Sequence, residues 1–414
     1  MLVTTHFMDE DVAKAEARLR EARALRDAAA GSRLPRVEAK ASASEQQLST
    51  NGQLPLAQIP GFDPRFSLFE AGFDASWEID LWGGTRRSLE AATARAAAAE
   101  ARHRDVLLQV VAQVVRTYAE LRGGQAALAA LRADAAAQSA IATLVRHRFQ
   151  AGDAARTDDA RAQAQARSSA ASIPGEEAEV RAAAYRLALL TARPPEALAD
   201  LAARPAPLPS TPTGFAAGLR SDLLRRRPDV RAAEAELAAA TADVGVQMAQ
   251  LFPSVSLLGS FTQQSRAVGE LASGGSTQFS IGPSLRWPIF SAGRIRAQVR
   301  AADARADAAA ARYEKAVLGA LADSETALNR YAAAIATLAE RQQARDDSAT
   351  ALDLVRQRYR SGEDDRLAVL QAQSALASAD AAATDARRRT LEAFAALIKA
   401  LGGGWAEAPG QANG

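Results

Sequence analysis

Four segments of the chain alternate strictly between apolar and polar residues, which is the pattern of a strand with two unlike faces. The clearest runs from Phe69 to Leu81, where Phe, Ala, Trp, Ile and Leu take the odd positions and Glu, Asp, Ser and Gly the even ones. The segments have about 9 to 13 residues, a length that crosses a bilayer when the strand is tilted. We predict strands at about 34–44, 67–82, 252–262 and 277–290.

The apolar faces of these strands need a partner other than water. A soluble β-sandwich would supply a second sheet, but the rest of the chain offers none, so lipid is the favoured partner. Four strands cannot close a barrel, which needs at least about eight, so we expect several copies to build one together. Trp77, Trp82 and Trp287 are suited to an aromatic girdle at the membrane interface or to packing where a strand meets a helix. The side chains expected to face lipid are Phe73, Trp77, Ile79, Leu257, Phe279, Ile281 and Trp287.

Two long helices without Pro are predicted from Arg86 to Phe149 and from Arg294 to Tyr359. Apolar residues recur seven apart in both, which indicates coiled-coil packing, and about 65 residues make a helix about 100 Å long. Return helices follow at about 157–190 and 366–401, the first with a break expected at Pro174. A non-transporting coiled-coil interaction protein is an alternative that these heptads allow, but it leaves the four strands unexplained.

The same order of elements occurs twice, which indicates an internal duplication. Each repeat has a short helix, two strands and a helical hairpin, and each long helix ends in an Arg, an aromatic residue and a Gly at the same spacing. Pro residues in the middle of the chain forbid a continuous helix there. We predict a first repeat at 1–190 with its hairpin at 84–190, an equatorial linker at 191–228, a second repeat at 229–405 with its hairpin at 293–401, and a disordered tail at 406–414.

Composition narrows the class of protein. The chain is 48% hydrophobic but only 5% aromatic, so closely packed Ala-rich helices are favoured over a bulky core. Charges of both signs are interleaved with a formal net charge of +2, and no basic cluster indicates nucleic acid. The absence of Cys excludes disulfides and a lipidated Cys in this chain. Residues 1–10 lack the basic start and apolar core of a secretory signal, which we interpret as a truncated or misassigned start.

The sequence carries no pattern of a chemical site. It has no Walker loop, nucleophile elbow or HExxH motif. His6, His103 and His147 are scattered, without a partner at metal-ligand spacing. The sequence therefore predicts no enzyme, no catalytic residue, no metal site and no cofactor.

Three stretches carry a resemblance to a known family, namely FDASWEIDLWG at 73–83, LRRRPDV at 224–230 and LGGGW at 401–405. With the element order, they make the chain resemble the outer membrane factor family, typified by TolC and OprM, and above all its NodT-like efflux branch. The resemblance implies a mainly α fold with a membrane β part, in which a homotrimer forms a 12-stranded β-barrel and a 12-helix α-barrel. The family often carries a lipid anchor and begins with a signal peptide, and this chain shows neither.

The resemblance also implies a function. A passive conduit in the outer membrane would carry drugs or other small molecules from an inner-membrane pump, of the RND type, and a periplasmic adaptor to the exterior. A type I secretion duct is the closest alternative. The sequence names no substrate, because a wide water-filled lumen selects little. Outer-membrane lipid is the remaining expected partner.

The tips of the two hairpins are the candidate site. By resemblance they contact the adaptor and close the tunnel, through Arg148, Phe149, Gly152, Asp153, Arg358, Tyr359 and Gly362. Members of the family often have two Asp residues just after the second tip, where this chain has Ala368 and Gln371. Glu363, Asp364 and Asp365 lie nearer the tip and are the alternative acidic gate. The interpretation that we prefer for these three residues is a solvated turn and a helix N-terminus, where acids are favoured.

Overall fold

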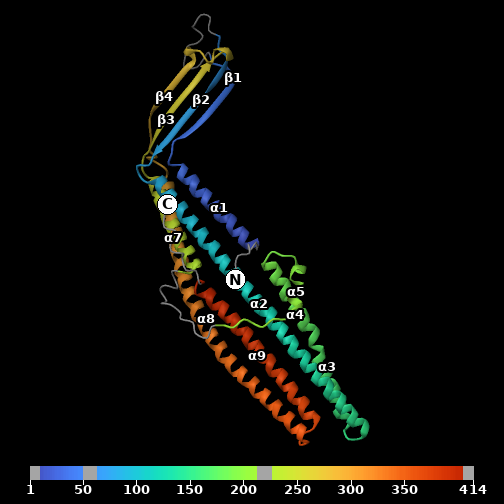
Figure 1. Cartoon of the computed structure of the whole chain (residues 1–414). Helices are drawn as coiled ribbons and strands as arrows, with labels where there is room; N and C mark the ends of the chain where they lie inside the picture. The colour runs from blue at the N-terminus through green and yellow to red at the C-terminus, as the bar shows by residue number, and fades with distance from the viewer. Residues whose placement is uncertain (1–9, 50–62, 212–225, 404–414) are drawn as a thin grey trace. The chain divides into compact units, whose positions relative to one another are not determined.

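A computed structural model describes residues 10–49, 63–211 and 226–403, whose helices and strands are shown in Figure 1. The chain divides into two compact units, each built from several segments of the sequence. Unit 1 comprises residues 1–17, 101–231 and 314–414, and unit 2 comprises residues 18–100 and 232–313. The predicted tail at 406–414 lies outside the described residues.

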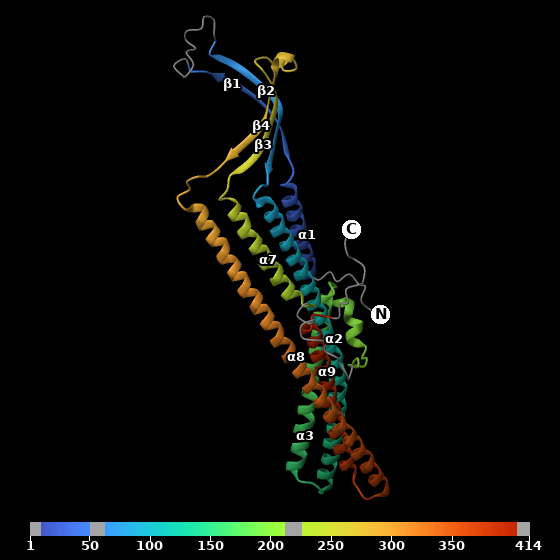
Figure 2. The same ribbon diagram turned by 90° about the vertical axis from the view of Figure 1, so that its left-hand side faces the viewer.

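Unit 2 contains one antiparallel sheet in the order β1-β2-β3-β4 (Figures 1 and 2). Two strands come from each half of the chain, and β2 pairs with β3 across the two halves. The sequence predicted four strands, and the sheet confirms them. The bounds are β1 Arg36–Gln47, β2 Arg65–Ile79, β3 Ser254–Ser265 and β4 Thr277–Arg286.

The ends of the strands differ from the predicted ones. β1 continues to Gln47, beyond the expected end at 44, because its pairing with β2 continues as far as Arg65. β4 ends at Arg286, before the expected end at 290. Pro288 follows two residues later and has no N–H to donate to a neighbouring strand. Trp287 therefore lies just outside the sheet.

Gly72 lets β2 and β3 approach closely. A Cβ built at Gly72 would overlap the carbonyl oxygen of Phe261, and it would lie 2.7 Å from the Cα of Thr262. Both are backbone atoms of the paired strand, which cannot rotate away as a side chain can. Gly259 in β3 has more room. A Cβ there would lie 3.8 Å from the Cβ of Ala75 and 4.0 Å from the carbonyl oxygen of Ser280, which are ordinary van der Waals distances.

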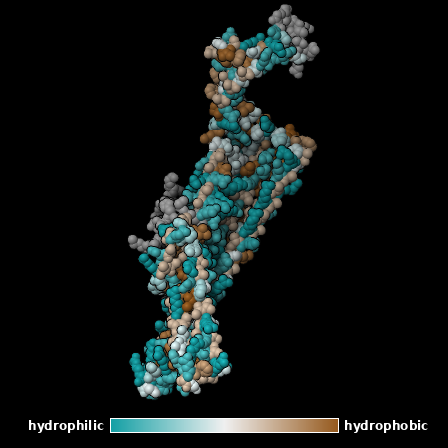
Figure 3. Space-filling view, turned by 90° about the vertical axis from the view of Figure 1, so that its right-hand side faces the viewer, coloured by the Kyte–Doolittle hydropathy of each residue, from teal (hydrophilic) through white to brown (hydrophobic). Residues whose placement is uncertain are grey.

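Two helices of 68 residues each dominate the chain. They are α2 (Gly84–Ala151) and α8 (Arg294–Ser361), and both pass from unit 2 into unit 1. The space-filling view shows pale brown, weakly hydrophobic stripes running beside teal polar residues along the helical part of the chain (Figure 3). No helix in residues 10–49, 63–211 and 226–403 is both long and apolar enough to span a membrane.

Both long helices end in the same Schellman geometry, as the two matching Gly residues predicted. Gly152 has φ +84°, and the N–H groups of Gly152 and Asp153 donate to the carbonyls of Phe149 and Arg148 at 3.1 and 2.8 Å. Gly362 has φ +82°, and its turn repeats the two bonds with Glu363, at 3.2 and 2.9 Å. The left-handed conformation costs little free energy at a Gly, so the positions of these two Gly residues determine where the chain turns back.

The return helices differ between the two hairpins. The first is split into α3 (Arg156–Ala171) and α4 (Ile173–Leu190), with Pro174 in the first turn of α4. Pro has no N–H to continue the bonds of the preceding helix, which explains the predicted break. The second return is the unbroken α9 (Arg366–Ala400). The remaining described helices are α1 (Glu10–Gly31), η2 (Pro195–Leu198), α5 (Ala199–Ala203), α7 (Pro228–Ala249), η3 (Val268–Glu270) and η4 (Gly274–Ser276).

Among the described residues of unit 1, the buried side chains form two small clusters rather than one large one. In the first, Leu121 of α2 packs against α4 around Val180 and Leu187. In the second, Tyr331 of α8 packs against Leu397 of α9. Leu121 and Tyr331 are both heptad positions, and both are buried. Most of the other buried residues are Ala, so the helices pack closely, with few large side chains between them.

Candidate functional site: the two-faced sheet and the hairpin tips

The register of the sheet places the apolar residues of all four strands on one face. Ala39, Phe73, Phe261 and Phe279 are paired in one row across the strands. Neighbouring rows on the same face hold four more of the expected lipid-facing side chains, Trp77, Ile79, Leu257 and Ile281, whereas Trp287 follows the end of β4. These apolar groups are exposed to a degree unusual for a folded protein, since Phe279 is 74% and Ile281 75% exposed.

The opposite face of the sheet is polar. Lys40 forms a salt bridge with Asp74 at 2.9 Å, and in the same row as Asp74 the hydroxyl groups of Ser260 and Ser280 lie 2.9 Å apart. Leu258 is the exception, because it pairs with Ser76 on this face and is exposed there. The sheet therefore presents one face suited to lipid and one suited to water.

Three Trp side chains fix the ends of the strands where they meet the helices of unit 2. The indole N–H of Trp77 donates to the carbonyl of Arg33 at 3.0 Å, and that of Trp287 donates to Leu251 at 3.3 Å. Trp82 donates to Pro253 at 2.7 Å and stacks on Phe252, with ring centroids 4.6 Å apart. These bonds favour junction packing for Trp77 and Trp287, although both rings stay partly exposed.

The stretch FDASWEIDLWG at 73–83, one of the three that carry the family resemblance, contains two residues that shape this junction. The carboxylate of Asp80 accepts hydrogen bonds from the backbone N–H of Thr85 at 3.2 Å and of Arg86 at 2.8 Å, so it caps the first turn of α2. Gly83 turns the chain between strand and helix with φ +78°.

The other two stretches meet in unit 1. The Arg227 side chain is only 10% exposed, and it forms salt bridges with Asp229 at 2.7 Å and Asp323 of α8 at 3.2 Å. It also donates to the carbonyl of Ala400 at the end of α9, at 2.9 Å. A Cβ at Gly402, which has φ +83°, would lie 3.1 Å from the backbone of Arg227. The Gly-rich segment therefore packs directly on the chain that precedes α7.

Charge pairing decides the ionisation of this cluster. Burial acts to lower the pKa of Arg227, but the hydrogen bonds and charges of Asp229 and Asp323 outweigh it and raise that pKa. Burial acts to raise the pKa of Asp229, but the guanidinium of Arg227 outweighs it and lowers that pKa. Arg227 and Asp229 are therefore both held in their charged forms.

The two hairpin tips, both in unit 1, are linked to one another. Arg148 at the first tip forms a salt bridge of 3.4 Å with Asp365 at the second. Within the second tip, Arg358 pairs with Asp364 at 3.2 Å and with Glu363 at 3.6 Å. Each of the three candidate gate acids thus has a basic partner.

Asp365 has a second role that separates it from its neighbours. It is the N-cap of α9, and its carboxylate accepts the backbone N–H of Ala368 at 2.9 Å. The first tip has no equivalent, because the N-cap of α3 is Ala155, without a side-chain cap. This geometry favours the helix N-terminus interpretation for Asp365. The aromatic residues Phe149 and Tyr359 are exposed at the tips, as is Gln371 beyond the second one.

A polar network that the sequence did not indicate joins the two hairpins farther from the tips. Asp134 of α2 accepts hydrogen bonds from the hydroxyl of Ser169 in α3 at 2.8 Å and from that of Ser374 in α9. Gln138 donates to the Ser374 hydroxyl at 2.9 Å. Single Ser and Gln residues on Ala-rich helices carry no signal that would reveal such a contact.

Within residues 10–49, 63–211 and 226–403, no three His, Cys, Asp or Glu residues converge so that they could hold a metal ion. His6, one of the three His residues weighed from the sequence, lies outside these ranges.

Residues 8–193 and 219–403 match the family described as outer membrane efflux protein. The chain is 34% identical to the pyoverdine export outer membrane protein OpmQ of Pseudomonas aeruginosa, over 96% of this chain and 83% of OpmQ. It is 34% identical to the outer membrane protein OprJ of the same species, over 80% of this chain and 69% of OprJ.

Solved structures share the mainly α fold with its small antiparallel sheet. The outer-membrane channel OprN matches with a TM-score of 0.84 and 37% identity, over 96% of this chain and 88% of OprN. The outer membrane protein VceC of Vibrio cholerae matches with a TM-score of 0.81 and 28% identity, over 96% of this chain and 93% of VceC. The chain therefore belongs to the outer membrane efflux protein family, and it is an outer-membrane channel component of an efflux system.

Proposed function

We propose that three copies of the chain join their sheets edge to edge into one 12-stranded barrel in the outer membrane. The supporting observation is the register of the sheet, which gathers the exposed apolar side chains on a single face. In the described part of the chain, the outer edges of β1 and β4 pair with no further strand. Unpaired edges are costly in hydrocarbon, and joining copies at these edges removes them.

In this proposal the helical hairpins of the three copies form a 12-helix tunnel in the periplasm. Each copy supplies a first repeat at 1–190 and a second at 229–405, joined by the equatorial linker at 191–228. The family match in two blocks, at 8–193 and 219–403, supports this division.

The assembly is a passive conduit for small molecules that a periplasmic adaptor and an inner-membrane pump of the RND type deliver. Relatives of similar identity are named for different cargoes, pyoverdine export in OpmQ and toluene efflux in TtgF. A duct common to such different molecules selects little among them. We therefore assign the choice of cargo to the pump.

The hairpin tips contact the adaptor in this proposal, and they close the tunnel at rest. The exposed rings of Phe149 and Tyr359 offer apolar contact area at the two tips. Glu363 and Asp364 supply the acidic lining of the gate, because Ala368 and Gln371 have no charge. The residues assigned to the adaptor contact are Arg148, Phe149, Gly152, Asp153, Arg358, Tyr359 and Gly362.

A pair of Arg substitutions on neighbouring residues of β4 tests the membrane face. Ile281→Arg places a charge on the apolar face, and Ser280→Arg places the same charge on the polar face. An Arg facing lipid at the midplane costs about 2–4 kcal/mol, and a barrel of three copies carries three of them. We expect refolding from urea into lipid vesicles to yield trimer with Ser280→Arg, on a denaturing gel run without heating, and none with Ile281→Arg. Equal trimer yields from both variants would contradict the proposal.

A further inference from the structure

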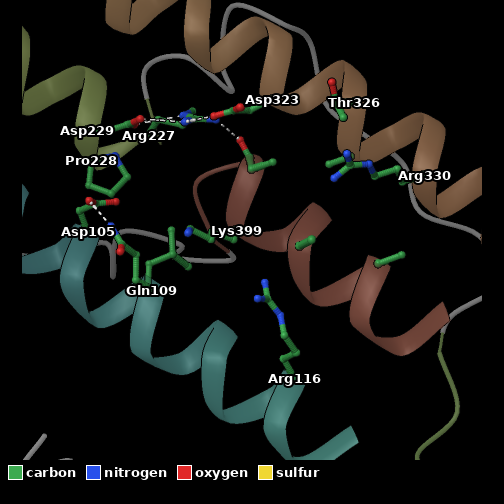
Figure 4. Close-up of a pocket in the computed structure, with 15 residues that line it drawn as sticks. Asp105, Gln109, Arg116, Arg227, Pro228, Asp229, Asp323, Thr326, Arg330 and Lys399 are labelled. Atoms are coloured by element: carbon green, nitrogen blue, oxygen red, sulfur yellow. Dashed lines mark hydrogen bonds and ion pairs between the residues drawn. The ribbon is translucent and has the colours of Figure 1, made fainter. Parts of the chain in front are cut away.

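An open, charged cavity of about 440 Å³ is lined by residues of unit 1 alone. It is bounded by α2, α8, α9 and the start of α7 (Figure 4). On α2 and on α8 the polar lining residues recur at helical spacing, so one face of each helix is turned to the cavity. The lining residues of α9 include Ala393, Ala396 and Ala400, whose small side chains leave the space open.

Three basic side chains from three different helices line this cavity. They are Arg116 of α2, Arg330 of α8 and Lys399 of α9. Figure 4 shows the three side chains on different sides of the space. In the described part of the chain none of them forms a salt bridge, whereas Arg227 in the same cavity forms two.

The acidic side chains that line the cavity interact with partners other than Arg116, Arg330 and Lys399. Asp229 and Asp323 are both paired with Arg227. Asp105 accepts a hydrogen bond from the amide of Gln109 at 2.7 Å. Burial raises the pKa of Asp105, and Lys399 and Arg227 partly oppose that rise from a longer range. Among the described acids that line the cavity, Asp105 is thus the one without a salt bridge, and its negative charge would repel an incoming anion.

We propose that this cavity binds a small organic or inorganic anion with at least two acidic groups, through Arg116, Arg330 and Lys399. Guanidinium and ammonium groups form their strongest hydrogen bonds with phosphate and carboxylate oxygens. Cations on separate helices suit an anion whose charges are spread over several atoms rather than a single point charge. The volume lies within the range of small-molecule sites, about 300–1,000 Å³. The hydroxyl of Thr326, one turn before Arg330, is a further donor on the cavity wall.

The site goes beyond the conduit function and does not depend on it, since all its residues lie in unit 1 of one chain. Bound anion would bridge α2, α8 and α9 and so stiffen this part of the helices. Phosphates and carboxylates share the recognition chemistry, so the two classes of ligand are compared directly with inorganic pyrophosphate and citrate.

Isothermal titration calorimetry of the full chain in detergent, at constant ionic strength, tests the site. We expect saturable binding of pyrophosphate, citrate or both, and the tighter of the two identifies the class. Arg116→Gln, Arg330→Gln and Lys399→Gln should each weaken that binding by about tenfold, as the loss of one charge-assisted hydrogen bond does. Arg387→Gln is the matched control, because Arg387 is exposed on α9 but does not line the cavity. It should change the affinity less than twofold.

A gain of affinity separates the site from a purely structural role of these residues. Asp105→Asn removes the opposing charge and keeps a side chain of the same size, so it should tighten binding severalfold. A variant that merely disturbed the fold would not bind more tightly. Three results would overturn the proposal: no saturable binding of either anion, an equal loss in Arg387→Gln and the three cavity variants, or no gain in Asp105→Asn.

Discussion

Asp365 performs two functions at the second hairpin tip that two substitutions can separate. Its carboxylate caps α9 through the N–H of Ala368 and pairs with Arg148 of the other hairpin. Asp365→Asn removes the charge but retains a side-chain oxygen, and Asn is as good an N-cap as Asp. Asp365→Ala removes both interactions. The difference between the two variants therefore isolates the cap.

The magnitudes follow from the geometry. Loss of an N-cap costs about 1 kcal/mol, which corresponds to about a fivefold increase in the opening equilibrium of the first turn of α9 at RT of about 0.59 kcal/mol. The salt bridge joins two side chains that are 47% and 50% exposed, so it contributes little, about 0–1 kcal/mol. We therefore expect Asp365→Asn to speed opening roughly twofold and Asp365→Ala clearly more.

Amide hydrogen exchange at the first turn of α9 measures this opening directly. The first tip supplies the converse test, because Ala155 occupies the N-cap of α3 without a side-chain bond. Ala155→Asp should slow exchange in the first turn of α3. If Asp365→Ala exchanged no faster than Asp365→Asn, the carboxylate would not be a cap. The acidic gate would then be the better interpretation of Asp365.

Two further substitutions test the inner contacts. Arg227→Gln leaves the carboxylate of Asp229 without its partner, and we expect a loss of about 2 kcal/mol, below the 3–5 kcal/mol of a fully buried pair, because the Asp229 side chain is 39% exposed. The pKa of Asp229 is lowered from 3.8, so its stabilisation is present above that pH and is lost on further acidification. The unfolding temperatures of the two proteins in detergent should therefore approach each other as the pH falls below about 4, with only the hydrogen bond from Arg227 to Ala400 still separating them, and a constant difference would contradict the pairing. Gly72→Ala should destabilise the sheet by about 1–3 kcal/mol or prevent its assembly, whereas the control Gly259→Ala should be nearly neutral in the same refolding assay; equal effects would refute the close approach of β2 and β3.

The features that the sequence predicted are those that local pattern controls. The alternation around Phe73 and Ile281 predicted which residues share the apolar face of the sheet, since side chains of a strand point to opposite faces in turn. Gly152 and Gly362 marked the ends of the long helices, and Pro174 marked the break in the first return. Each of these signals acts through its own backbone and needs no distant partner.

The features that the sequence missed depend on residues far apart in the chain. Arg227 pairs with Asp323, and Asp134 contacts Ser374, only because packing of the helices brings them together. Nothing in the spacing of these residues indicates the contact. The end of β4 at Arg286 was missed because apolar residues continue to Phe290, although Pro288 limits the pairing of the backbone.

We propose that the apolar face of the sheet meets lipid in a ring of three copies. Electron microscopy of the purified protein in lipid nanodiscs can show both the ring and the position of the lipid. We expect particles with threefold symmetry, in which the lipid belt surrounds the strands that carry Phe73, Phe279 and Ile281 while the helices lie outside the belt. Monomeric particles that stay in solution without lipid or detergent would contradict it.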